Sequence, residues 1–271
     1  MTASNDMSAT DELLYETDAA GIARITLNRP QARNALTFAM YQGLIDRCAA
    51  IEADASVKVL VISGAGDKAF AAGTDIAQFR GFSSGEDAID YERFMDRVMN
   101  ALERLPVPVI AAVAGACTGG GAAIAAACDL RIATEDAKFG FPIARTLGNC
   151  LSLANLKRLS DLIGPARVKD MIFTARLVGA REALAIGLVG EVVPDAPALA
   201  TRATELATLV AGHAPLTLRA TKEGLRRLQA MDETEGERPG DDLIRLCYTS
   251  ADFREGMEAF LGKRAPRWKA E

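Results

Sequence analysis

The sequence predicts an α/β protein, with a core of alternating strands and helices followed by a helical C-terminal region. Two observations lead to this prediction. Short β-type runs alternate with helix-like segments up to about residue 195, and nearly everything beyond Pro197 has helical character. We therefore divide the chain of 271 residues into a core at 12–195 and a helical region at 196–271.

The first elements have clear local signals. Residues 21–28 alternate apolar and polar side chains, which predicts a half-buried strand. Thr37 is expected to cap a helix that extends to about Ala53. The apolar run at 57–63 predicts a buried strand, and the glycines at 64–66 predict a turn after it.

The middle of the chain continues the alternation. A polar loop at 82–87 precedes a segment with apolar residues at helical spacing, so we expect an amphipathic helix at about 88–104. The next elements are a strand at 107–113, a helix of small residues at 119–128 and a strand at 130–133.

The core ends with several shorter elements. We expect helices at about 152–163, 166–174 and 181–186, and a strand at 188–193. In the helical region beyond them, a charged segment rich in Gly and Pro at 232–242 is interpreted as a solvated linker.

Composition limits the possible partners. The chain is 49% hydrophobic and carries a formal net charge of −5, which suits a globular protein with a sizeable core. Nucleic acid and anionic membranes favour basic surfaces, so neither is expected as the main partner. A local basic patch for a phosphorylated ligand remains compatible with this charge.

Cysteine and histidine usage points to a cytoplasmic protein without a metal. The five cysteines form no C-x-x-C pair, which fits reduced thiols in the cytosol. His213 is the single histidine, so a multi-histidine metal site is excluded, and we expect this side chain to cap or pack. The first 18 residues have no apolar segment typical of a secretory signal.

One uncharged run, from Leu105 to Cys128, is apolar enough to suggest a membrane helix. Prolines near its start and a glycine triplet near its middle interrupt it. A strand, a tight turn and a buried helix explain the run better, so no membrane span is expected.

Two glycine-containing segments are candidates for ligand binding: 68–76 (KAFAAGTDI) and 114–121 (AGACTGGG). Glycines at a strand-to-helix turn let a ligand approach the backbone, and a helix N-terminus offers unpaired N–H groups. The second segment is therefore a suitable place for an oxyanion. Packing alone could explain either segment, but their joint occurrence favours a site.

Two nucleotide-binding interpretations compete with this one. A P-loop needs Gly-Lys-Ser/Thr after its glycines, but Gly121 is followed by two alanines. The pattern Gly64-x-Gly66-x-x-Ala69 matches a dinucleotide fingerprint, although Gly73 interrupts the helix that should follow.

In the order of the chain, these and further motifs resemble the crotonase superfamily, the enoyl-CoA hydratase/isomerase family. The matching segments are Asn28-Arg29-Pro30, Arg33–Leu36, Ala69–Ile76, Pro108–Gly115, Gly119–Gly121, Cys128-Asp129, Phe139–Pro142, Gly187–Val189 and Phe253–Leu261. The resemblance spans residues 12–268. It implies a crotonase (ClpP-like) fold, with a repeated ββα spiral core and a C-terminal helical region.

The resemblance also implies a chemistry. An acyl-CoA thioester would place its carbonyl oxygen between the main-chain N–H groups of Thr74 and Gly120, which form an oxyanion hole. Coenzyme A is part of the substrate, and no separate cofactor is expected. Further residues expected to contact the substrate are Ala32, Arg33, Ala35, Ala72, Asp75, Ile76, Gly119, Pro142 and Lys263.

The resemblance further implies a homotrimer or a dimer of trimers. In it, Lys263 or Arg264 of a neighbouring subunit would meet the phosphates of coenzyme A, unless these cations simply end a solvated helix. The amphipathic C-terminal segment supports an oligomer, because it carries more apolar area than a terminal helix should expose. The residues concerned are Leu243, Leu246, Phe253, Phe260 and Trp268.

The chain departs from the family at its acid–base positions. The two glutamates of the family's hydratases are replaced by Ala123 and Ile143, and Leu151 occupies the place of an aspartate used by some relatives. None of these side chains can transfer a proton. Asn149 and Cys150 are the catalytic candidates that remain. Asn149 would hold a water or polarise a substrate group, and Cys150 would have a lowered pKa before a helix N-terminus, although a packing thiol is the alternative for Cys150.

Other polar side chains in the same segments have weaker assignments. Thr146 is a candidate for holding a water, and Arg145 either binds a substrate carboxylate or joins a structural ion pair. Asp75 is expected to organise its own loop. The sequence therefore predicts an acyl-CoA-processing enzyme without two-glutamate hydration. The alternatives are a non-catalytic acyl-CoA-binding protein, or a decarboxylase, isomerase or hydrolase of a specific acyl-CoA.

Overall fold

The computed structural model describes residues 12–230, 245 and 248–267, and its strands form two sheets. The strands are β1 (Leu13–Thr17), β2 (Ile22–Leu27), β3 (Val59–Gly64), β4 (Ala69–Ala71), β5 (Val109–Val113), β6 (Ala116–Thr118), β7 (Leu130–Thr134), β8 (Lys138–Gly140), β9 (Val178–Gly179) and β10 (Glu191–Val193). The larger sheet has the order β1-β2-β3-β5-β7-β10, and the smaller has the order β4-β6-β8-β9. Apart from the antiparallel pairs β1/β2 and β8/β9, neighbouring strands run parallel.

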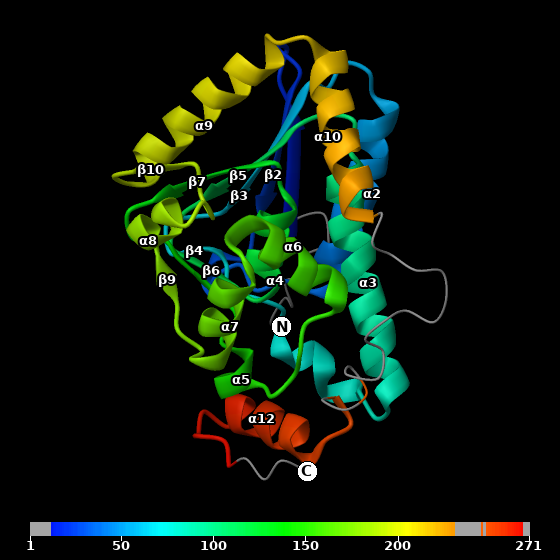
Figure 1. The fold of residues 1–271 in the computed structure, drawn as a ribbon, viewed down its shortest axis with the longest axis vertical. Coiled ribbons are helices and arrows are strands. Elements are labelled where there is room, and N and C mark those ends of the chain that lie inside the picture. The colour runs from blue at the N-terminus through cyan, green and yellow to red at the C-terminus, as the bar shows by residue number, and fades with distance from the viewer. Residues whose placement is uncertain (1–11, 231–244, 246–247, 268–271) are drawn as a thin grey trace, which may run out of the picture.

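The helices surround these sheets (Figure 1). The α-helices are α2 (Phe38–Ala53), α3 (Gly85–Arg104), α4 (Gly120–Ala127), α5 (Ile143–Thr146), α6 (Leu153–Ile163), α7 (Pro165–Phe173), α8 (Ala180–Ala185), α9 (Ala196–Ala211), α10 (Pro215–Ala230) and α12 (Ala251–Leu261). Two short 3-10 helices, η1 (Pro30–Ala32) and η2 (Ile76–Gly81), lie in the loops.

The chain contributes strands to the two sheets alternately. The pairs β3/β4, β5/β6 and β7/β8 each give one strand to the larger sheet and then one short strand to the smaller sheet. A helix follows each pair, namely α3, α4 and α5. This arrangement confirms the predicted ββα spiral core and helical C-terminal region.

Both faces of the larger sheet are buried, which explains the continuous apolar run in β3. Leu60 and Ile62 face the main core between the sheet and helices α2–α4, whereas Val59 and Val61 face the opposite side. Helix α9 covers that opposite side, as Figure 1 shows. Alternating side chains therefore serve two separate cores.

Helix caps fix several boundaries. Thr37 accepts a hydrogen bond from Met40 N, which confirms its predicted capping role for α2. Helix α3 starts earlier than the predicted residue 88, because Ser84 and Asp87 form a capping box at its N-terminus. The predicted strand at 188–193 is likewise shorter, since Leu188 and Val189 pack in the main core before β10 begins.

The C-terminal elements reach different parts of the molecule. Helix α10 packs on α3, whereas α12 lies at the far end of the molecule beside α5 and η2 (Figure 1). Phe253 of α12 is 3% exposed and packs in the protein's own interior, so it is not available for an intersubunit contact. Phe260 is 49% exposed, as the oligomer prediction requires. Leu243, Leu246 and Trp268, like the predicted linker at 232–242, lie outside the described residues.

Within the described residues, no helix is both long enough and apolar enough to cross a membrane. The run from Leu105 to Cys128 instead forms β5, β6 and α4, which confirms the predicted strand, turn and buried helix.

Candidate active site

Thr74 lies in a loop that is held against the start of α2. Leu36 N donates to Gly73 O at 2.8 Å, and Asp75 N donates to Leu36 O at 2.9 Å. These bonds form a parallel bridge between Leu36 and Thr74, so the N–H of Thr74 itself points to the other side. No described residue accepts a hydrogen bond from it.

Gly120 begins α4, so its N–H has no acceptor within the helix. Gly119, just before it, has φ 52° and ψ −122°, a conformation that suits glycine alone, and its N–H donates to Gly140 O at 3.0 Å. A Cβ at Gly120 would overlap the hydroxyl of Tyr41. The helix start therefore requires a glycine at each of these positions.

The two glycine segments lie against one another. A Cβ built on Gly73 would be 3.4 Å from Thr118 O and 3.9 Å from Gly120 N. The structure thus places side by side the two loops that carry Thr74 and Gly120, each with a main-chain N–H free of protein acceptors in the described part. Whether they bind a thioester oxygen stays a prediction.

The side chain of Thr74 lies within hydrogen-bond distance of two tyrosines, neither of which was predicted from the sequence. Thr74 Oγ1 is 2.8 Å from Tyr41 Oη and 2.8 Å from Tyr91 Oη. Burial raises the pKa of both tyrosine hydroxyls above the ordinary value, so they stay neutral. The three hydroxyls fix the Thr74 loop onto α2 and α3, and no local pattern in the sequence links these three residues.

The predicted coenzyme A-binding residues lie around the same loop. Ala72 N donates to Arg33 O at 3.0 Å, which brings the segment 32–35 next to the start of the Thr74 loop. Arg33 adopts a left-handed conformation with φ 52°, and its side chain is exposed. Ala32 and Ala35 are partly exposed, and Ala72 is exposed. These positions are accessible to a ligand.

Asp75 organises its own loop, as predicted. Its carboxylate accepts a hydrogen bond from Ala77 N and caps η2. It also pairs with Arg29 at 3.2 Å, and Arg29 donates to Ala35 O at 2.6 Å. Ile76, which follows, is partly buried against an apolar cluster with Tyr91 and Cys150.

The three positions that lack carboxylates are all in apolar surroundings. Ala123 is 6% exposed in the main core, and Ile143 and Leu151 pack partly buried against that core. Pro142 precedes Ile143 and accepts a hydrogen bond from Thr146 Oγ1 at 2.9 Å. Arg145 is exposed and forms no ion pair with another described residue, so the predicted structural ion pair is not found there.

A buried polar cluster lies beside these positions and includes Asn149. Asn149 Nδ2 donates to Tyr248 Oη at 3.1 Å, and Tyr248 Oη donates to Glu92 Oε1 at 2.7 Å. Glu92 is 4% exposed, and burial raises its pKa to about 7. Neither Glu92 nor Tyr248 was predicted from the sequence. The one available signal was that Glu92 falls on the apolar face of an amphipathic helix.

The remaining candidates, Cys150 and His213, lie in an apolar cluster and at an exposed helix end. Cys150 is half-buried in the cluster around Phe79 and Tyr248, and His213 is exposed at the end of α9, where its main-chain N–H donates to Val210 O. Within the described residues, no group of His, Cys, Asp or Glu is arranged to hold a metal ion.

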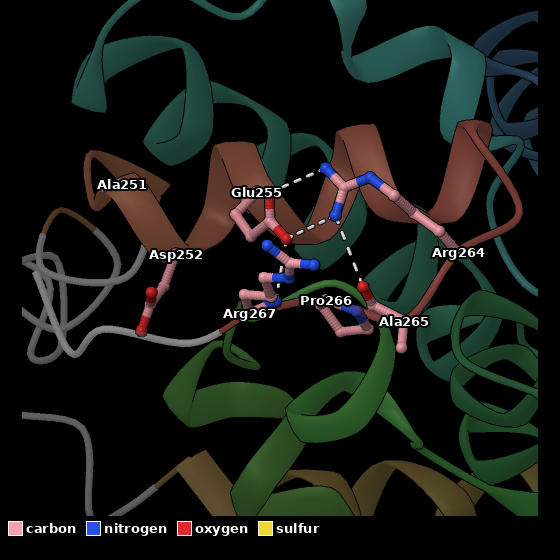
Figure 2. Close-up of a pocket in the computed structure, with 7 residues that line it drawn as sticks. All are labelled: Ala251, Asp252, Glu255, Arg264, Ala265, Pro266 and Arg267. Carbon is pink, nitrogen blue, oxygen red and sulfur yellow. Dashed lines mark hydrogen bonds and ion pairs between the residues drawn. The ribbon is translucent and has the colours of Figure 1, made fainter.

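The predicted phosphate-binding cations lie at the end of α12. Arg264 forms two hydrogen bonds with the carboxylate of Glu255, at 2.6 and 2.8 Å, as Figure 2 shows. This pair lines a hollow of about 610 Å³ that also includes Asp252, Pro266 and Arg267. Arg264 is thus neutralised, whereas Lys263 is exposed and pairs with no described acid. The hollow is separate from Thr74 and Gly120.

Known proteins resemble this chain over nearly its whole length. The short-chain-enoyl-CoA hydratase of Clostridium acetobutylicum is 35% identical over 90% of this chain and 92% of its own. The crotonyl-CoA hydratase of Syntrophomonas wolfei is 36% identical over the same shares of the two chains.

Solved structures agree. An enoyl-CoA hydratase/carnithine racemase from Magnetospirillum magneticum has a TM-score of 0.77 at 35% identity and covers 96% of each chain. A methylmalonyl-CoA decarboxylase in complex with 2-nitronate-propionyl-CoA has a TM-score of 0.87 at 28% identity, over 96% of this chain and 99% of its own. The family described as enoyl-CoA hydratase/isomerase matches residues 17–271. The chain therefore belongs to the enoyl-CoA hydratase/isomerase family and has the crotonase fold.

Proposed function

We propose that this protein is an enzyme that processes an acyl-CoA thioester, using the N–H groups of Thr74 and Gly120 as an oxyanion hole. The observation that carries the proposal is the juxtaposition of these two donors. They come from neighbouring loops, and neither has an acceptor among the described residues.

The chemistry follows from where negative charge develops. When the α-carbon of a thioester loses a proton or a carboxylate, or when its carbonyl carbon is attacked, negative charge accumulates on the thioester oxygen. Two fixed main-chain donors stabilise that charge without reorganising, and each typically contributes two to three orders of magnitude in rate (~10²–10³). Gly120 N also lies at the positive end of α4.

Coenzyme A would lie along Ala32, Arg33 and Ala35 and the main chain near Ala72, with Gly119 and Ile76 nearer the acyl group. Lys263 of a neighbouring subunit would meet its phosphates, and no cofactor other than this part of the substrate is required. We further propose a homotrimer or a dimer of trimers in the cytoplasm. Exposed leucines on α9 and α10 support the assembly: Leu209, Leu216, Leu225 and Leu228.

Simple two-glutamate hydration is not part of this proposal, since Ala123 and Ile143 cannot transfer protons. We expect wild-type turnover of crotonyl-CoA to be well below the ~10 s⁻¹ of a median enzyme. Absorbance loss of the enoyl thioester measures this rate directly. Hydration at the rate of a dedicated hydratase would show that another group supplies the proton transfer and would refute this part of the proposal.

Ligand specificity is the broader test. Isothermal titration should show binding of crotonyl-CoA and acetyl-CoA and much weaker binding of ATP and NAD. Tighter binding of NAD than of any CoA ester would overturn the proposal. A panel of acyl-CoA esters followed by mass spectrometry then identifies the reaction as decarboxylation, isomerisation or hydrolysis. Binding of the panel without turnover would instead support a non-catalytic acyl-CoA-binding protein, which the apolar side chains at 123, 143 and 151 favour.

A further inference from the structure

The loop that carries Asn149 is fixed to α3 through Ser152. Ser152 Oγ donates to Asp96 Oδ1 at 2.8 Å, and the main-chain N–H of Ser152 donates to the carboxyl group of Glu92. Ser152 is 4% exposed and also caps α6. Asn149, three residues earlier, is therefore held at a defined place beside Glu92.

The hydrogen-bond chain from Glu92 determines which way the Asn149 amide points. An ionised Glu92 can only accept, so Tyr248 gives its single proton to Glu92, at 2.7 Å. The Tyr248 oxygen is then available only as an acceptor, and Asn149 must present Nδ2 to it, at 3.1 Å. The amide oxygen, Asn149 Oδ1, consequently points away from Tyr248.

This oxygen is buried and has no hydrogen-bond partner among the described residues. A buried acceptor that stays unsatisfied is costly, so such an atom calls for a ligand donor. The residue that holds the other end of the amide, Tyr248, connects Asn149 to the Thr74 loop. The Tyr248 ring lies 6.5 Å from the Tyr91 ring, between centroids, and the Tyr91 hydroxyl contacts Thr74.

On the basis of the acyl-CoA site proposed above, we propose that Asn149 Oδ1 accepts a hydrogen bond from a hydroxyl group carried by the bound acyl chain. Tyr248 and Glu92 are positioning residues that hold the amide in this orientation. The site therefore favours a hydroxyl group, which can donate, over a ketone, which can only accept.

Protonation of Glu92 would reverse the direction of the hydrogen bonds from Glu92 through Tyr248 to Asn149. A protonated Glu92 donates to the Tyr248 oxygen, because its other hydrogen-bond partner, Ser152 N–H, is itself a donor. Tyr248 then donates to Asn149, the amide turns over, and Nδ2 faces the acyl chain. The preference for a hydroxyl over a ketone should therefore be present above the pKa of Glu92 and weaken below it.

The charged and titratable surroundings of Glu92 suit such a change near neutral pH. The pKa of Glu92 is about 7 as the net result of four effects: burial raises it most, the hydrogen bond from Tyr248 lowers it, the neighbouring Asp96 raises it, and the hydrogen bond from the Ser152 N–H lowers it. Tyr91 on α3 and Tyr41 on α2 also interact with the Glu92 carboxylate, and both stay neutral. Helix α4, which packs on α3, has no titratable side chain.

The test compares dissociation constants of matched CoA esters by isothermal titration. In the wild type at pH 8, 3-hydroxybutyryl-CoA should bind about three- to tenfold more tightly than acetoacetyl-CoA, the effect of one hydrogen bond. At pH 6 this ratio should fall towards one. The pair 4-hydroxypentanoyl-CoA and 4-oxopentanoyl-CoA, measured in the same way, covers a hydroxyl placed one carbon further along.

Variants separate the effect of the Glu92–Tyr248–Asn149 hydrogen bonds from general effects of pH. In Glu92→Gln the ratio should no longer depend on pH, and in Tyr248→Phe or Asn149→Leu it should be near one at both pH values. Glu86→Gln is the matched control, because Glu86 lies on the same helix with its side chain 63% exposed, and it should retain the wild-type ratios. Free acetoacetyl-CoA ionises to the same extent whichever variant is titrated, so the comparison between wild type and variants isolates the contribution of Glu92.

Two results would overturn the inference. One is equal affinity for hydroxy and oxo esters in both pairs at pH 8, and the other is a ratio that is the same at pH 6 and pH 8 in the wild type. If both members of a pair bind tightly and equally, only this inference fails. If no CoA ester binds, the proposed function fails with it.

Discussion

Replacing Glu92 with glutamine should stabilise the protein in a pH-dependent way. Burial is the largest cause of the raised pKa of this carboxyl, which is about 7 in the folded chain against an ordinary value of 4.5. The unfolded chain therefore releases the proton of Glu92 at a lower pH than the folded chain does. Between these two pKa values the folded state binds more protons, so its stability falls as pH rises.

The size of the effect follows from the two pKa values. Each unit of pKa difference corresponds to about 1.4 kcal/mol. Between pH 4 and pH 8 the free energy of unfolding of the wild type therefore falls by about 3 kcal/mol because of this group. Glutamine cannot ionise and keeps an acceptor for Tyr248. The free energy of unfolding of Glu92→Gln, relative to wild type, should therefore rise by about 3 kcal/mol over the same range.

Urea unfolding at equal protein concentration, followed by circular dichroism at several pH values, measures this difference. Other titrating groups cancel between wild type and variant. Glu86→Gln, on the exposed side of the same helix, should show a difference that hardly changes with pH. A similarly flat difference for Glu92→Gln would refute the reasoning, because the buried carboxyl would then titrate alike in both states.

Three further results are expected. Gly120→Ala should lower the free energy of unfolding by about 1–3 kcal/mol, because the new Cβ overlaps the Tyr41 hydroxyl. Adding Tyr41→Phe to the same chain should restore much of this loss. Equal melting temperatures of wild type and Gly120→Ala would contradict the prediction. Lys222→Met should lower the free energy of unfolding in urea by about 1.5–3 kcal/mol, because the Asp129 carboxylate loses the ammonium 2.7 Å away. Lys157→Met, in an exposed ion pair, should lower it by about 1 kcal/mol or less. Light scattering at micromolar concentration should give three or six times the 28.7 kDa subunit mass, and a monomer would count against the proposed assembly.

Most strands of the larger sheet and most helices were predictable because each has a local signal. The buried run of β3 and the Thr37 cap of α2 are examples. The smaller sheet was not predicted, because β4, β6 and β8 have three residues each, too few to establish a period of two. Strand β1 was missed because its exposed polar residues make Leu13–Thr17 resemble a loop.

The candidate site was predicted only where its residues belong to sequence motifs. Thr74 and Gly120 lie in glycine-containing segments that are recognisable from the sequence alone, and the structure brings these segments together. Glu92 and Tyr248 are separated by 156 positions, and no local pattern links them. Glu92 lies on the apolar face of α3, which is a local sign of a buried acid, but its partner Tyr248 comes from a segment far along the sequence.

The composition of α4 has a thermodynamic consequence for the site. Apart from Ile124, all its residues are glycine or alanine, and a Cβ at Gly121 would overlap Ala71. Alanine and glycine have no side-chain rotamers to lose, so this helix becomes ordered without the entropy cost that larger side chains carry. The direction of its first N–H group therefore does not depend on side-chain rotamers of this helix. Thermal rotation of side chains within the helix leaves the direction of this N–H group largely unchanged.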